Sequence, residues 1–201
     1  TNPFYFSPAV YHRGSGKVTL AAVSGSQDEA NVPSSPTLIS TMYMRTETGG
    51  SVDATDDNLT CQVQNICSCF DDYPAGGCTA APSSAAMPVS QPILLENNPG
   101  TGARMEAFYL FYDPPTSACG TGSSWLIRFS TAGATQKLEQ AKEFPGVRAT
   151  GMTLAGGGKD ILITKVGKGG AKATVEQANS AITGGAAATS PPVIESWREV
   201  R

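Results

Sequence analysis

Histidine is almost missing from this sequence, since His12 is the only one among 201 residues. A Ser-His-Asp mechanism would have to be built on His12, and metal centres with several histidine ligands are excluded. No run of apolar residues approaches the roughly 18 that a membrane-spanning helix needs, which excludes a helix of that kind.

Charged residues are also scarce, at 15% of the chain, against about 25% in an average soluble protein. The formal net charge is -3, so a broad nucleic-acid-binding surface is not expected. Residues 1–100 hold nine acidic and three basic side chains, whereas residues 101–201 hold eight acidic and eleven basic ones. This asymmetry indicates either two solvated faces or an acidic loop that binds a cation or a basic partner.

The chain begins Thr1-Asn2-Pro3, without an initiator methionine and without the charged and apolar regions of a signal peptide. We therefore expect it to be processed or to be a piece of a longer protein. Apolar residues make up 40% of the chain, which is enough for a folded core.

Four of the five cysteines, Cys61, Cys67, Cys69 and Cys78, lie in one short window, and Cys119 stands apart. The spacing lacks the C-x2-C pairs typical of zinc sites, so we predict disulfides and an oxidising compartment. A bridge between Cys67 and Cys69 would close a very small, strained ring. Two pairings remain open: 61–67 with 69–78, or 61–69 with 67–78. Cys119 is then unpaired or paired outside this chain.

Short apolar runs bounded by Gly, Pro, Ser or Asn predict a β-rich fold. The expected strands are 17–23, 37–45, 104–112, 123–130, 151–155 and 160–166. Several of these runs are apolar on both faces, which is typical of strands covered on both sides in stacked sheets. In 104–112, one face holds Phe108, Leu110 and Tyr112, and the other holds Tyr109 and Phe111. In 123–130, we expect Trp125, Ile127 and Phe129 to share one face.

Residues 46–103 interrupt this rhythm with glycines, prolines, acidic residues and the cysteine cluster, and we interpret them as an insertion. Helix-forming residues predict short helices over 135–143 and 172–182. Residues 183–201 are interpreted as a linker and a C-terminal segment, which leaves 1–182 as the folded part.

Acidic side chains flank the cysteines. Asp53, Asp56 and Asp57 form a group that could bind calcium, although the alternate spacing of an EF-hand loop is missing. Asp71 and Asp72 are candidate binding contacts. A glycosidase would need a pair of catalytic carboxylates. The candidate pairs are Asp56 with Asp72 and Glu106 with Asp113, but nothing in their sequence context selects them.

Three groups of segments, taken in order, resemble the C-terminal β-propeller of the PilY family of type IV pilus tip proteins. The first is Phe6-Ser7-Pro8-Ala9-Val10 followed by 18–25 and Gln27-Asp28-Glu29. The second is 108–112, Pro114-Pro115, Cys119-Gly120, Gly122, Ser124-Trp125-Leu126 and Gly133. The third is Trp197-Arg198-Glu199. The match departs at Ser26-Gln27-Asp28-Glu29, which lacks the arginine of the family's turn, and in the cysteine-rich insertion, which is not a general family feature.

The resemblance implies an all-β fold: the last blades of a β-propeller, with a disulfide-rich loop insertion. It implies a non-enzymatic adhesin module that is exported through the periplasm to the cell surface at the pilus tip. The implied partners are minor pilins or the remainder of a larger parent protein, and a host or abiotic surface. The family's calcium loop has no match here, so the resemblance supplies no calcium ligand. The alternative is a structural subunit of an extracellular filament or sheath.

Overall fold

The structure, a computed structural model, describes residues 3–14, 16–25, 39–52, 58–70, 80–97, 104–116, 120–132, 135–155, 160–166 and 174–177. These residues form three antiparallel sheets, which we call A, B and C, and a short helical turn. The expectation of an all-β fold is confirmed. The sheets are open, and the described strands close neither a barrel nor a propeller ring.

Sheet A has the order β1-β2-β3-β4, and β5 also pairs with β3. Its strands are β1 (Ala9–Gly14), β2 (Lys17–Ser24), β3 (Thr41–Thr48), β4 (Ser51–Val52) and β5 (Leu59–Gln62). The turn from β1 to β2 includes Gly16, whose φ of 73° lies in the left-handed region that favours glycine.

Sheet B has the order β10-β9-β8-β6, and β7 also pairs with β8. Its strands are β6 (Met87–Pro88), β7 (Ile93–Asn97), β8 (Arg104–Asp113), β9 (Ser123–Ala132) and β10 (Thr135–Pro145). Sheet C has the order β11-β12-β13, from β11 (Arg148–Ala155), β12 (Asp160–Val166) and β13 (Thr174–Gln177). Strands β4, β5, β6 and β7 come from residues 46–103, where the sequence pattern does not predict strands.

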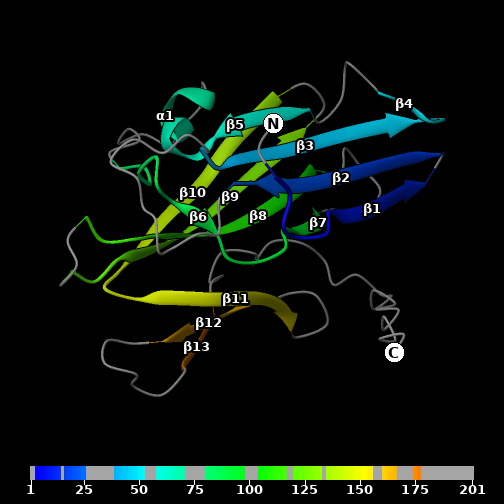
Figure 1. The fold of residues 1–201 in the computed structure, drawn as a ribbon. Helices are drawn as coiled ribbons and strands as arrows, with labels where there is room; N and C mark the ends of the chain where they lie inside the picture. Colours follow the sequence, from blue (N-terminus) through cyan, green and yellow to red (C-terminus); the bar gives the residue numbers. More distant parts are fainter. Residues whose placement is uncertain are drawn as a thin grey trace, which may run out of the picture.

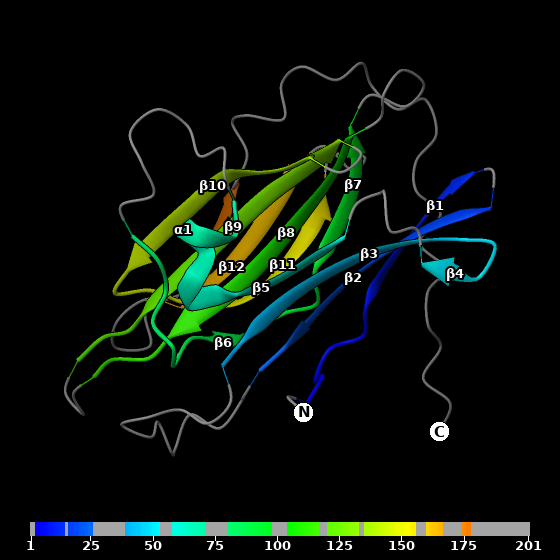
Figure 2. The same cartoon turned by 90° about the horizontal axis from the view of Figure 1, so that it is seen from above.

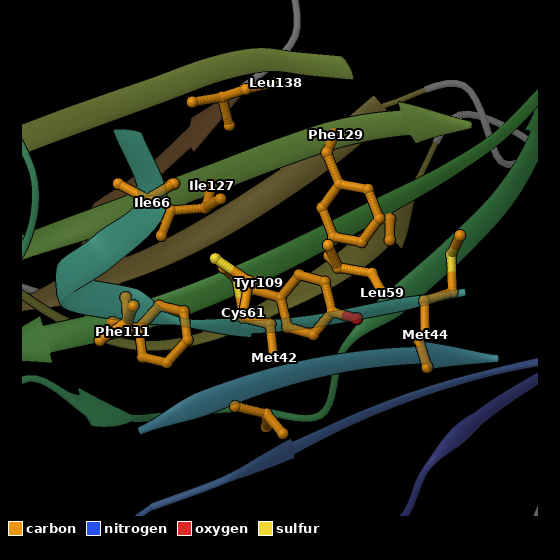
Figure 3. Packing of buried hydrophobic residues seen from close by; sticks show 14 of the residues in the cluster. Met42, Met44, Leu59, Cys61, Ile66, Tyr109, Phe111, Ile127, Phe129 and Leu138 are labelled. Carbon is orange, nitrogen blue, oxygen red and sulfur yellow. The ribbon is translucent and has the colours of Figure 1, made fainter. Parts of the chain in front are cut away.

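The three sheets stack face to face, with sheet B in the middle (Figure 1). Seen from above, β11 and β12 of sheet C lie behind the strands of sheet B (Figure 2). One core lies between sheets A and B and includes Met42, Met44, Tyr109, Phe111 and Phe129 (Figure 3). A second core between sheets B and C is built from Phe108, Leu110, Leu126, Phe144, Ala149, Ile161 and Ile163. The middle sheet is therefore buried on both faces, as stacked sheets require.

The predicted division of faces in β8 and β9 is confirmed. Tyr109 and Phe111 enter the core beside sheet A, whereas Phe108 and Leu110 enter the core beside sheet C. Trp125, Ile127 and Phe129 of β9 share the sheet A side. Successive side chains of a strand point to opposite faces of the sheet. A strand that is apolar at every position is therefore predicted to pack against another layer on each face.

The helix predicted over 135–143 is wrong, because these residues belong to β10 and pair with β9 along its whole length. The register shifts between Leu138 and Gln140, which inserts one extra residue. This bulge places Leu138 and Ala141 on the same side of the sheet, three residues apart, as they would be on a helix. The helix predicted over 172–182 is also wrong where the structure describes it, since 174–177 form β13.

Two tyrosine hydroxyls join sheets A and B. Tyr109, which is 1% exposed, donates to the backbone carbonyl of Tyr43 over 2.7 Å. Tyr11 on β1 donates to a carboxylate oxygen of Glu96 on β7 over 2.9 Å. Burial raises the pKa of both phenols. For Tyr11 the hydrogen bond to Glu96 and the negative charge of that carboxylate add to the effect, and its pKa reaches about 12.

The raised pKa of Tyr11 makes the stability of the fold sensitive to alkaline pH. The unfolded chain loses this proton near pH 10, whereas the folded chain holds it until about pH 12. Stability is therefore full below pH 10 and is expected to fall as the pH rises toward 12. The Tyr11→Phe variant should show a shallower fall over this range in urea unfolding at a series of pH values. An equally steep fall in Tyr11→Phe would contradict the assignment, and Tyr5→Phe, at an exposed ring, is the control.

No helix in the part of the chain that the structure describes is long and apolar enough to cross a membrane.

Candidate functional site

Three cysteines of the cluster, Cys61, Cys67 and Cys69, lie on a disulfide-bonded helical turn at the end of sheet A, which we call the stapled turn. After β5 the chain turns through η2 (Val63–Asn65) and α1 (Ile66–Cys69). A disulfide joins Cys61 to Cys69, with 5.9 Å between their α carbons, and it is one of the two pairings left open above. Cys67 is disulfide-bonded as well. Cys78 and Cys119 lie outside the described residues.

Apolar side chains anchor this turn to the core. Val63, Ile66 and Phe70 are at most 4% exposed, and the Phe70 ring lies 5.6 Å from that of Phe129. The backbone amide of Val63 donates to the carbonyl of Ser40 over 2.9 Å. Ile66 reaches toward Ile127 on sheet B (Figure 3). The turn thus covers part of sheet B while its other side faces solvent.

The solvent side of the turn is polar and internally bonded. Gln62, Asn65 and Ser68 are exposed. The Asn65 side-chain amide donates to the Gln62 side-chain oxygen over 3.1 Å, and the Ser68 hydroxyl donates to the Asn65 carbonyl over 3.1 Å. A disulfide and a packed core already fix this polar surface, so little conformational entropy would be lost if a partner bound it.

Opening the Cys61–Cys69 bridge should destabilise the fold measurably. The bridge closes a loop with a sequence separation of 8, and releasing a loop of this size costs about 2–3 kcal/mol in the chain-entropy model. The double variant Cys61→Ser/Cys69→Ser should therefore lose about this much free energy of unfolding in urea. Ser68→Ala in the same turn is the control, and an equal effect of the two changes would refute a stabilising bridge.

The calcium-binding and contact candidates fall in parts of the chain that the structure does not describe. Asp53, Asp56 and Asp57 lie outside the described residues, as do Asp71 and Asp72. Within the ranges that the structure describes, no group of three or more His, Cys, Asp or Glu side chains is arranged to hold a metal ion. The predicted calcium site stays a prediction.

The suggested carboxylate pair of Glu106 and Asp113 does not form. Both residues belong to β8 and are seven positions apart, a separation of about 23 Å that also places them on opposite faces. Glu106 is 3% exposed and receives two hydrogen bonds, at 3.1 and 2.9 Å, from the Arg128 guanidinium. Asp113 accepts from the Ser83 amide over 2.8 Å. Each carboxylate has a structural partner instead.

The outer face of sheet A presents apolar side chains that belong to neither of the two cores. Its side chains alternate with those of the core beside sheet B, and cross-strand pairs join Val10 to Leu20 and Ala22 to Tyr43. Val10 is 51% exposed. Phe4 is 57% exposed, and its ring centroid lies 5.5 Å from that of Tyr43. No described sheet packs over this face.

Sequence patterning could have found this face, because Val18, Leu20 and Ala22 are apolar at positions that alternate with the core residues of β2. Comparisons with known proteins add no relative: no protein family, no curated protein and no solved structure matches the chain.

Proposed function

We propose that this chain is a non-enzymatic module of a secreted surface protein, and that its sheets are the last blades of a propeller in a type IV pilus tip adhesin. The observation that carries the proposal is the face-to-face stack of antiparallel sheets, whose middle sheet is covered on both sides. In a β-propeller, the sheets that form neighbouring blades likewise pack face to face around a central channel. The sequence resemblance to the PilY family points to the same architecture.

The outer face of sheet A supports the part of the proposal that concerns a larger assembly. Val10 and Phe4 would lie against a neighbouring sheet of the parent protein, much as sheet A lies against sheet B. Exposed apolar side chains that adjoin on one surface are typical of such contacts. The neighbouring sheet would come from the remainder of the parent protein.

The stapled turn supports the part of the proposal that concerns adhesion. In this proposal its polar surface at Gln62, Asn65 and Ser68 meets a minor pilin, a host surface or an abiotic surface. Two features suit work outside the cell: a disulfide-bonded turn and a low content of charged residues. Export through the periplasm would allow the disulfides to form.

The proposal is tested by deleting the coding region for residues 1–201 in the source organism and measuring surface pili and attachment. We expect both to be lost, and to return with the wild-type region. Complementation with Val10→Asp should fail, because a charge would enter the contact with the neighbouring sheet. Thr153→Asp, at an exposed position of sheet C, is the matched control and should restore both.

Two results would overturn this function. One is normal piliation and attachment after the deletion. The other is assembly of the purified chain into filaments, which would favour a structural subunit of a filament or sheath instead.

A further inference from the structure

One row of side chains on sheet A is polar where it faces sheet B. The cross-strand pairs place Tyr11 of β1 opposite Thr19 of β2, and Thr19 opposite Thr46 of β3. Ala21 and Met44, two positions along the strands from Thr19 and Thr46, belong to the core between the two sheets. Residues two apart on a strand share a face, so the polar row also points toward sheet B.

Sheet B presents a matching row toward sheet A. Its members are paired from strand to strand across β7, β8, β9 and β10, and they are Glu96, Met105, Thr131 and Gln136. Met105 belongs to the core between sheets A and B. Side chains that are directly opposite in an antiparallel pair lie on the same face, so the whole row points toward sheet A.

Hydrogen bonds at both ends hold the two rows face to face. At one end the Tyr11 hydroxyl donates to the Glu96 carboxylate over 2.9 Å. At the other end, the Asn58 side-chain oxygen accepts from the Thr46 amide over 3.3 Å, and the Asn58 carbonyl accepts from the Gln136 side-chain amide. The middles of the two rows therefore face each other between these bonds.

Three buried threonine hydroxyls lie in the middle of the rows. Thr19 and Thr46 are 0% exposed, and their hydroxyl oxygens are 3.0 Å apart, so one hydroxyl donates to the other. Thr131 is 1% exposed, and no group among the described residues forms a hydrogen bond with its hydroxyl. A hydroxyl has one proton and two lone pairs. The Thr19–Thr46 pair therefore keeps one proton to donate, and Thr131 can both donate and accept.

The length of the side chains indicates that the threonines leave space between the sheets. Stacked sheets lie about 10 Å apart. In the adjoining row of the same core, long side chains such as Met44 and Phe129 reach into this distance from the two sheets (Figure 3). Thr46 and Thr131 are shorter, so they span less of the same distance.

We propose that one buried water molecule binds between sheets A and B, bonded to the Thr131 hydroxyl on one side and to the Thr19–Thr46 pair on the other. Water donates two protons and accepts two, so it can take the proton that the pair retains and satisfy the hydroxyl of Thr131. Buried waters typically make about three hydrogen bonds to polar groups that the protein leaves unpaired. This site does not rest on the proposed function.

The site is tested by oxygen-17 relaxation dispersion on the whole chain, which counts the water molecules that stay bound for longer than the tumbling time of the protein. The Thr131→Val variant keeps the shape of the side chain and removes its hydroxyl. We expect this variant to hold one long-lived water fewer than wild type, and Thr131→Ser, which keeps a hydroxyl, to hold the same number. Thr153→Val, at an exposed position of sheet C, is the matched control and should also keep the wild-type number.

Urea unfolding and NMR give two further readouts. Loss of the water bridge should lower the urea midpoint of Thr131→Val relative to wild type, whereas removal of a hydroxyl that has no partner would raise it. In the wild-type chain we also expect nuclear Overhauser effects from water to the methyl groups of Thr19, Thr46 and Thr131, a measurement that needs no variant to fold. An unchanged water count in Thr131→Val, a raised midpoint, or methyl groups without these effects would overturn the site.

Discussion

Glu106→Gln should lower the free energy of unfolding by about 3–5 kcal/mol, because it leaves a buried guanidinium without its counter-charge. Arg128 is 8% exposed and donates two hydrogen bonds to Glu106, which is 3% exposed. The pair joins β8 to β9 on the side that faces sheet C. Urea unfolding followed by circular dichroism measures the loss, which is a large fraction of the stability of a typical domain.

Two controls separate the missing counter-charge from other effects. Glu139→Gln changes a carboxylate that pairs with Lys137, whose side chain is 42% exposed, and should cost no more than about 1 kcal/mol. Replacing both partners, as Glu106→Leu with Arg128→Met, should recover much of the loss, because no buried charge remains. A single Glu106→Gln variant as stable as wild type would show that the pair is not buried as described.

Phe129→Ala should also cost about 3–5 kcal/mol, through a cavity between sheets A and B. The Phe129 ring is fully buried and stacks on Tyr109, with 5.5 Å between the ring centroids and 12° between the ring planes. It also contacts the Phe70 ring beside the stapled turn. Phe129 belongs to the core shared with sheet A, so this one substitution loosens the packing of sheet B against both sheet A and the turn.

The matched control is Phe4→Ala, which removes the same atoms from a ring that is 57% exposed. This variant should lose less than about 1 kcal/mol in the isolated chain. Similar losses for the two variants in urea unfolding would contradict the assignment of Phe129 to the core and of Phe4 to the outer face.

Strands with two apolar faces were the most predictable part of the fold. In β8 the alternation of Phe108 and Leu110 with Tyr109 and Phe111 predicts a strand covered on both sides, and both covers are present. Strand β12 matches its predicted range of 160–166. Buried strands carry their own signal, because every position must be apolar or satisfied.

Strand β10 was not predictable because two local features favour a helix. Its lysines, glutamates and glutamines have high helix propensity. Leu138 and Ala141 are three residues apart, as on one face of a helix, and the bulge near Glu139 lets them share one face of the sheet. Pairing with β9 outweighs this propensity. Strands β5 and β7 were missed because they are short edge strands that depend on the strands beside them.

The candidate site was predictable only in part. Cysteine spacing predicts a stapled segment, yet it left the pairing of Cys61 open, because pairing depends on how α1 folds back on β5. The contacts of Lys142 and Lys165 with the Phe144 ring could not be predicted from the sequence, since the two lysines come from different sheets. Only the stacking of sheets B and C brings them to one ring.

We propose that the outer face of sheet A contacts a neighbouring sheet of the parent protein. To detect this contact, a photoreactive phenylalanine analogue is placed at Val10 in the source organism, intact cells are irradiated, and the cross-linked product is identified by mass spectrometry. We expect a cross-link from Val10 to another sheet of the parent protein, and none from the same analogue at Thr153 of sheet C. A folded, exported protein that forms no cross-link at Val10, or that links only to a second copy of itself, would contradict it.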